Sequence, residues 1–356
     1  MKDIVLLDLF SGAGGFAKGL EEAGFKIKKH YFSEIDKHAI ANYKYNFKNG
    51  EYVGSVTDVR GSGIDRPDII TFGSPCQDFS LAGKRSGMEG QRSVLILEAI
   101  RIISECKPSA FIWENVKGTF SSNNGADFWA IIAAFANIGG YRLEWQLLNT
   151  SWFLPQNRER IYLVGHLAGR SEPGVFPIGK NVSRINGRTK KAEAVSEVTL
   201  ISSFGRNDKQ KIDKKVNPIN ANCITSRMYK DFKENLIINS NTSKGYEIAT
   251  EGDNIPYANN IRRLTEIECE RLQGFPDGHT EFGMYLPAWI EKHLKKKEKF
   301  THPDLWLKTY LNALKRFEST RLMPIPKTQR YKLMGNAVTV KVVKAVAERL
   351  TLKFKP

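Results

Sequence analysis

The hydrophobic positions in the first half of the chain follow two alternating spacings. Short continuous apolar runs predict buried strands, whereas apolar residues that recur every three or four positions predict helices. Strands are expected at 5–10, 28–33, 68–72, 110–113, 143–148 and 161–164, and helices at 16–24, 36–47, 94–106 and 128–138. Strands that alternate with helices predict an α/β fold with a doubly wound, mostly parallel sheet.

The pattern changes near Gly169. Residues 170–256 are rich in Asn, Ser, Gly and Lys and contain only short β-like pieces such as 236–238. Helical spacing returns at 338–350, directly after Gly335-Asn336-Ala337, and we expect this helix to pack on the first half.

These changes predict two domains. The larger α/β domain is expected at 1–168, completed by 331–356. A smaller, irregular, β-rich domain is expected at 169–330, with a basic helical insertion at about 284–325.

Positive charge gathers outside the predicted sheet. The formal net charge of the 356 residues is +16. Residues 170–256 hold 15 Lys and Arg against 10 Asp and Glu, and residues 284–332 hold 12 against 4. Such a distribution is typical of a protein that binds a polyanion, nucleic acid before membrane. Solvated helical faces are the alternative explanation for part of it.

The four cysteines, Cys76, Cys106, Cys223 and Cys269, are far apart and form no CxxC or CxxH pair. That spacing argues against a zinc site and against a disulfide framework, so no metal is expected. The first residues lack a signal-peptide pattern, and no apolar run is long enough to span a bilayer. We therefore expect a cytoplasmic protein with free thiols, in which Cys106 and Cys269 are packed.

A glycine-rich loop at 8–16 joins the first expected strand to the first helix. Its glycines permit close approach of the backbone to a ligand. Glu34 ends the second strand, where a carboxylate can accept hydrogen bonds from ribose hydroxyls. A tight structural turn is the alternative, but loop and acid together favour a nucleotide-type cofactor, with NAD not excluded.

Cys76 follows the strand at 68–72, within Ser74-Pro75-Cys76-Gln77. Pro75 stiffens the start of this loop. Residues 77–92 contain three glycines and several cations, which predicts a mobile lid over a substrate. A thiol beside cations is a good nucleophile, although a packed cysteine explains this segment alone equally well.

A carboxyl group and two arginines extend this site. Glu114 ends an apolar strand beside Trp113, so desolvation is expected to raise its pKa and let it carry a proton. Gln156, Arg158 and Arg160 alternate at the start of a strand and therefore share one face. A thiol, a protonated carboxyl and guanidinium groups suit nucleophilic addition to an electron-poor heteroaromatic ring. Two ordinary surface arginines are the alternative.

Together these motifs resemble those of the DNA (cytosine-5) methyltransferases of bacterial and phage type. The matching segments are 8–16, Pro75-Cys76-Gln77, Glu114-Asn115-Val116, Gln156 with Arg158 and Arg160, 263–277 and 335–338. Six motifs in family order are a specific signal. The resemblance implies a Rossmann-like, class I S-adenosylmethionine-dependent methyltransferase fold. Residues 1–168 and 331–356 would then be the catalytic and cofactor-binding domain, and 169–330 the target recognition domain.

The resemblance also implies the ligands. S-adenosylmethionine would be held by Phe10, Gly12, Gly14, Glu34, Asn336 and Ala337. The implied substrate is double-stranded DNA, from which a cytosine is flipped into the pocket. Its expected contacts are Ser74, Pro75, Gln77, Ser80, Asn115 and Gln156. A monomer, with a cognate restriction endonuclease as a separate chain, is expected.

The implied reaction methylates cytosine at C5. Cys76 would attack C6 while Glu114 contacts and protonates N3 and C5 takes the methyl group. Arg160 would hold the cytosine O2, and Arg158 would organise the loop and the thiolate.

The sequence departs from the family pattern at Ser55, where the family often has an acid for the adenine amino group. Asp58 is the candidate substitute. A tRNA methyltransferase of the same fold is one rival, but its Cys-Phe-Thr segment is absent. A catalytically silent DNA-binding subunit is another, against which the intact Cys76, Glu114 and Arg160 argue.

Overall fold

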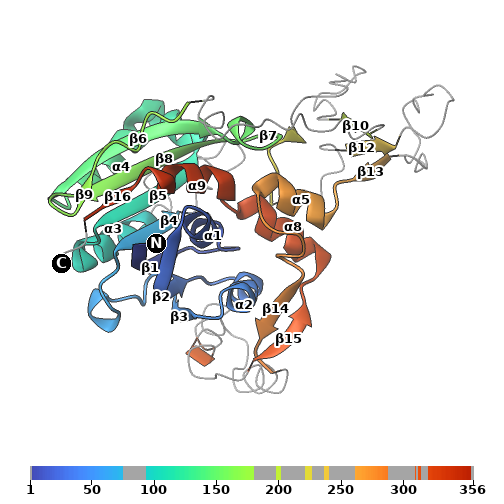
Figure 1. Ribbon diagram of the computed structural model, residues 1–356, viewed down its shortest axis with the longest axis horizontal. Helices are drawn as coiled ribbons and strands as arrows, with labels where there is room; N and C mark the ends of the chain where they lie inside the picture. The colour runs from blue at the N-terminus through green and yellow to red at the C-terminus, as the bar shows by residue number, and fades with distance from the viewer. Residues whose placement is uncertain are drawn as a thin grey trace.

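A seven-stranded sheet forms the centre of the molecule (Figure 1). The computed structural model describes residues 2–74, 94–179, 198–201, 221–226, 236–239, 261–287, 309, 312–313 and 320–353. The strand order is β3-β2-β1-β4-β5-β8-β6. The strands are β1 (Lys2–Leu9), β2 (Phe25–Ser33), β3 (Gly50–Gly54), β4 (Ile69–Gly73), β5 (Ala110–Val116), β6 (Tyr141–Asn149) and β8 (Glu159–Leu167).

The sheet is parallel from β3 to β5, and β8 runs antiparallel to both of its neighbours. This confirms the predicted doubly wound, mostly parallel fold. The helices that complete it are α1 (Gly15–Glu22), α2 (Lys37–Asn46), α3 (Val94–Cys106), α4 (Ala126–Ala136) and α9 (Val340–Glu348).

Helices cover both faces of the sheet. Side chains of α1, α2 and α9 belong to one core cluster, whereas those of α3 and α4 belong to another. Because successive strand residues point to opposite faces, Leu6 of β1 lies in the first cluster and Leu7 in the second. This two-sided burial explains why the strands read as continuous apolar runs.

Helix α9 packs on α1, as predicted. A Cβ at Gly19 would lie 2.5 Å from a side-chain carbon of Val343, so only glycine permits this approach. The strand β16 (Thr351–Leu352) then pairs with β9 (Ser171–Glu172). Residues after 337 therefore complete the α/β layer structure.

A second group of elements lies beside helix α2 (Figure 1). Helix α5 (Glu266–Gln273) begins with a capping box between Thr265 and Glu268. Strands β14 (Phe282–Tyr285) and β15 (Arg321–Pro324) pair antiparallel, and α8 (Lys327–Asn336) follows. The side-chain amide of Asn42 on α2 donates hydrogen bonds to the carbonyls of His279 (2.8 Å) and Phe282 (3.2 Å).

The other described residues of the predicted recognition domain form short strands. β10 (Val198–Ile201), β12 (Leu236–Asn239) and β13 (Ile261–Arg263) form a three-stranded antiparallel sheet, which confirms the strand expected at 236–238. β7 (Gln156–Asn157) pairs in parallel with β11 (Ala221–Asn222). Most of the insertion expected at 284–325 lies outside the described residues, so its helical character stays a prediction.

Two kinds of feature are absent from the described part of the chain. No helix there is long and apolar enough to cross a bilayer. No group of three or more histidine, cysteine, aspartate or glutamate side chains there is arranged to hold a metal ion.

Candidate active site

The predicted site residues that the structure describes come together because parallel strands end at the same edge of the sheet. Leu9, at the end of β1, pairs with Ser33 on β2 and with Phe72 on β4. Glu114 on β5 pairs with Gly73. Strand β8 is antiparallel, so its beginning reaches this same edge, where Arg160 pairs with Val116.

The glycine loop and Glu34 form one half of the site. Phe10 has a φ of 52°, which is uncommon for a residue with a side chain. Among the described residues, a Cβ at Gly12 would meet only the Phe10 carbonyl oxygen within 4 Å, at 3.9 Å, so no described side chain covers this face of the loop. Helix α1 starts at Gly15, and Gly14 precedes it as the left-handed N-cap.

The Glu34 carboxylate holds the loop and the strand end together. It accepts hydrogen bonds from the backbone N–H of Gly12 (3.0 Å), Ile35 (2.7 Å) and Asp36 (3.0 Å). A carboxylate offers about four acceptor positions, so one remains for a ligand hydroxyl. Loop and carboxylate thus fit a nucleotide-type cofactor. The side chain of Ile35 is 47% exposed and adds an apolar surface that the sequence reading missed.

The end of α8 closes this half. Asn336 is exposed and Ala337 is buried. The next carbonyl oxygen, that of Val338, lies 2.6 Å from where a Cβ would stand on Gly15, so the segment contacts the start of α1. Lys332 of α8 forms an ion pair of 2.5 Å with Asp36. Asn336 and Ala337 are therefore close to the glycine loop, and their cofactor contacts stay a prediction.

Ser55 and Asp58 lie in the turn after β3. The Ser55 hydroxyl is 3.0 Å from that of Thr57, and the N–H of Asp58 donates to the Ser55 carbonyl (2.9 Å). The side chain of Asp58 is exposed. Which of these two side chains meets an adenine amino group stays open.

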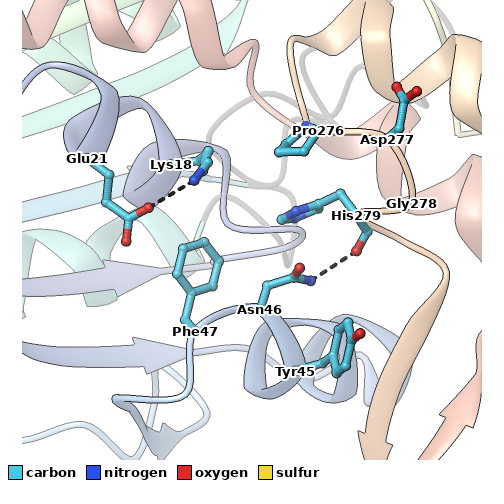
Figure 2. A pocket seen from close by; sticks show the side chains of 9 residues that line it. All are labelled: Lys18, Glu21, Tyr45, Asn46, Phe47, Pro276, Asp277, Gly278 and His279. Carbon is cyan, nitrogen blue, oxygen red and sulfur yellow. Dashed lines mark hydrogen bonds and ion pairs between the residues drawn. The ribbon is translucent and has the colours of Figure 1, made fainter.

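A small pocket of about 280 Å³ lies behind the glycine loop (Figure 2). It is bounded by Lys18 and Glu21 of α1, by the end of α2 and by the turn at 276–279. His279 Nε2 is 2.8 Å from the carbonyl oxygen of Ala13. The turn therefore supports the loop from the side away from the strand ends.

A buried carboxyl lies beneath the loop. Asp8 accepts hydrogen bonds from Thr71 Oγ1 (2.7 Å) and from the hydroxyl of Tyr43 (2.9 Å), which is 2.7 Å from His30 Nε2. Burial raises the pKa of Asp8 to about 7 and lowers that of His30 to about 4. Asp8 is therefore ionised in the folded chain only at the upper end of the neutral range.

This burial predicts a pH-dependent difference between the wild type and Asp8→Asn. The unfolded carboxyl ionises near pH 4 and the folded one near 7, so the contribution of Asp8 to wild-type stability falls as pH rises between these values and then levels off. The asparagine variant cannot ionise, and its free energy of unfolding should lack this fall. Urea unfolding of both proteins at pH 5, 6, 7 and 8 measures the difference. Parallel curves would contradict the burial argument.

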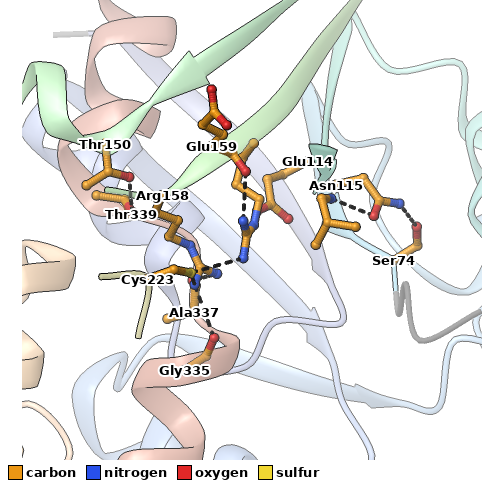
Figure 3. A network of polar contacts seen from close by, with 12 residues as sticks. Ser74, Glu114, Asn115, Thr150, Arg158, Glu159, Cys223, Gly335, Ala337 and Thr339 are labelled. Atoms are coloured by element: carbon orange, nitrogen blue, oxygen red, sulfur yellow. Dashed lines mark hydrogen bonds and ion pairs between the residues drawn. The ribbon is translucent and has the colours of Figure 1, made fainter. Parts of the chain in front are cut away.

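Glu114 is the centre of the second half of the site (Figure 3). It is 8% exposed, and Arg160 Nε lies 3.1 Å from its Oε1 as an ion pair. The pair lacks hydrogen-bond geometry, and Oε1 is a buried oxygen without a hydrogen-bond partner among the described residues. Burial raises the pKa of Glu114, and the charges of Arg160 and Arg158 oppose that rise. Such a carboxyl can supply a proton to a ring nitrogen.

Ser74 fixes the end of β4 beside Glu114. Its buried hydroxyl accepts hydrogen bonds from Trp113 Nε1 (3.1 Å) and Asn115 Nδ2 (3.3 Å). The Asn115 Oδ1 accepts from the N–H of Val116 (2.8 Å). The next predicted site residues, Pro75, Cys76, Gln77 and Ser80, lie outside the described residues, so the nucleophile stays a prediction.

Gln156 and Arg158 hold a segment of the recognition region, residues 221–226. Arg158 is buried and donates to the carbonyl of Ile224 (3.1 Å). It also donates to the carbonyls of Gly335 (3.3 Å) and Ala337 (2.9 Å) (Figure 3). Gln156 accepts from the N–H of Ile224 (2.9 Å) and donates to the carbonyl of Leu272 (2.8 Å). The alternation along β7 and β8 is confirmed, and the observed contacts of both side chains are with protein backbone.

Cys223 is a member of the site that the sequence reading missed. Its sulfur accepts from Arg158 Nη1 (3.4 Å) and from Arg160 Nη2 (3.7 Å). The two guanidinium groups lower the pKa of the thiol despite its burial. No local pattern marks Cys223, because its neighbours come from strands more than 60 residues away.

Comparisons with known proteins identify the family of this chain. The family described as C-5 cytosine-specific DNA methylase matches residues 4–286. The Type II methyltransferase M.HaeII of Haemophilus aegyptius is 35% identical over 78% of this chain and 84% of its own length. The Type II methyltransferase M1.ScrFI of Lactococcus lactis subsp. cremoris is 29% identical over 97% and 77%.

A solved structure shares the fold. The Dnmt2 methyltransferase of S. pombe superimposes with a TM-score of 0.59 at 19% identity and covers 96% of each chain. The family match extends over most of the chain and includes the glycine loop, Glu114 and the arginine pair. The chain belongs to the C-5 cytosine-specific DNA methylase family, whose members are DNA (cytosine-5) methyltransferases.

Proposed function

We propose that this enzyme transfers a methyl group from S-adenosylmethionine to C5 of a cytosine flipped out of double-stranded DNA. The observation that carries the proposal is Glu114, a buried carboxyl with a raised pKa at the same sheet edge as the glycine loop. Its Oε1 is ion-paired with Arg160 and accepts no hydrogen bond among the described residues. A ring nitrogen of cytosine fits that oxygen, and the loop with Glu34 fits the cofactor. When bound, the cofactor supplies the methyl group.

The protein residues carry the remaining chemistry. The Cys76 sulfur forms a bond to C6 while Glu114 transfers its proton to N3, so C5 becomes electron-rich and accepts the methyl group. A base then removes the C5 proton, the sulfur–C6 bond breaks, and the proton on N3 returns to Glu114. Arg160 holds the cytosine O2 and balances the charge beside Glu114.

Arg158 has a supporting role in this proposal. Its guanidinium binds three backbone carbonyls and so fixes the end of α8 against segment 221–226. Ser74 sets the direction of the chain into the loop that contains Cys76. Asn115, Gln156, Pro75, Gln77 and Ser80 complete the proposed walls of the base pocket.

The basic composition of residues 169–330 supports double-stranded DNA as the substrate. The curated relatives include Type II methyltransferases, which supports a role in a restriction-modification system in the cytoplasm of a prokaryotic cell. A monomeric enzyme, with the cognate endonuclease as a separate chain, is part of the same proposal.

The proposed function predicts methyl transfer to duplex DNA and not to tRNA. Labelled S-adenosylmethionine is incubated with the enzyme and each nucleic acid, and bisulfite sequencing then locates the modified cytosine. DNA affinity should fall steeply with salt, by roughly 10³-fold between 50 and 200 mM if about six phosphates are contacted. The Glu114→Gln variant is the matched control. Transfer to tRNA alone would refute the proposed substrate.

A further inference from the structure

The sulfur of Cys223 connects two arginines that act on different parts of the site. Arg158 binds backbone carbonyls near the cofactor half, whereas Arg160 faces the Glu114 carboxyl. Cys223 accepts from one nitrogen of each guanidinium. Among the described residues, the charged groups around the sulfur are these two arginines and, beyond Arg160, Glu114. The sulfur is also 3.6 Å from the Ile224 carbonyl, to which the neutral thiol donates, and the carbonyls of Gly335 and Ala337 bind Arg158.

The backbone on either side of Cys223 is firmly held. Ala221 pairs with Gln156, and Ile224 exchanges hydrogen bonds with Gln156 and Arg158. A Cβ at Gly335 would lie 2.2 Å from the backbone of segment 221–226, so only glycine lets the segment approach α8 this closely. Cys223 therefore has little freedom to move away from the guanidinium groups.

We infer that Cys223 is a positioning residue of the base pocket, which ties segment 221–226 of the recognition region to the guanidinium that faces Glu114. The Arg160 guanidinium faces Glu114 with Nε and donates from Nη1 to the Glu159 carbonyl (2.7 Å). The sulfur of Cys223 accepts from the remaining nitrogen, Nη2. Movement of the recognition segment would then change how Arg160 meets the carboxyl and the base.

The sulfur can do this most strongly as a thiolate. An anionic acceptor binds a guanidinium more tightly than a neutral one, and the two arginines favour the ionised form. The other described thiols differ, since burial raises the pKa of Cys106 to about 11 and also raises that of Cys269. The catalytic role of Cys223 rests on the proposed function. The ionisation of its thiol can be measured independently of that function.

The first test measures alkylation, which needs no methyl transfer. The full-length protein is treated briefly with iodoacetamide between pH 6 and 10, and peptide mass spectrometry measures the modified fraction at each cysteine. Because the thiolate reacts, Cys223 should reach half-maximal rate below pH 9, before Cys106. Arg160→Met should shift its midpoint upward. A midpoint at 9 or above in the wild type would overturn the inference, whatever the enzyme does to DNA.

The second test compares Cys223→Ala, Cys223→Ser and Cys106→Ala. Cys223→Ala should lower kcat about tenfold, since a hydrogen bond to the charged Arg160 is lost. The KM for S-adenosylmethionine should be unchanged, because Arg158 keeps its bonds to the carbonyls of Gly335 and Ala337. Serine keeps an acceptor and should restore part of kcat. Cys106 lies at the end of α3, near the beginning of β5 and away from the strand ends that form the site. Cys106→Ala should therefore have the kcat of the wild type.

The outcomes separate the two proposals. Equal kcat in Cys223→Ala and the wild type, or equal losses in the alanine and serine variants, would overturn the positioning role. Circular dichroism and thermal unfolding show whether each variant is folded. A wild type that methylates no DNA would refute the proposed function and leave the alkylation result intact.

Discussion

Glu114→Gln should lower the rate of methyl transfer to DNA by roughly 10³- to 10⁴-fold, because the amide cannot deliver a proton to the base. The substitution keeps the shape of the side chain, and its amide can still lie beside Arg160. Single-turnover methyl transfer on a duplex substrate measures the loss. S-adenosylmethionine binding, measured by calorimetry, should be unchanged, since Glu34 and the glycine loop are intact.

The role of Glu114 as an acid also predicts the direction in which the wild-type rate changes with pH. The reactive form of Glu114 is protonated, and burial raises its pKa. The chemical rate should therefore fall as pH rises through that raised pKa, whereas the residual rate of Glu114→Gln should not show this fall. A glutamine variant within tenfold of the wild type, or the same falling profile in both proteins, would remove Glu114 from the role of acid.

Cys76→Ala should abolish methyl transfer altogether. Without the sulfur no bond to C6 forms, and C5 does not become nucleophilic enough to accept the methyl group. A duplex with 5-fluorocytosine at the target should trap the wild type as a covalent adduct, because the C5 substituent cannot leave as a proton. Denaturing gel electrophoresis detects the adduct, and Cys106→Ala is the matched control. Turnover in Cys76→Ala would exclude this cysteine as the nucleophile.

The sheet could be predicted largely because buried parallel strands are continuous apolar runs. Several elements were missed, and β3 and α8 illustrate the physical reasons. Strand β3 is short and has glycine at both ends, which resembles a turn. Helix α8 buries only its last residues, from Leu333 to Gly335, so it shows no apolar stripe, and Gly335-Asn336 ends this helix instead of standing in a loop.

The candidate site could be predicted where its residues follow directly from strand ends. Glu34 and Glu114 are such residues, because a parallel sheet brings its carboxyl ends to one edge. The contacts of Arg158, Gln156 and Cys223 could not be predicted. Each depends on segment 221–226 lying against α5 or α8, and this packing joins parts of the chain that are 60 or more residues apart.

The packing of α9 on α1 affects when this enzyme becomes active during its synthesis. Gly15 and Gly19 of α1 lie against Val338 and Val343, which are translated more than 300 residues later. A chain without these residues has an incomplete wall beside the glycine loop. We therefore expect ribosome-bound and prematurely terminated chains to methylate no DNA.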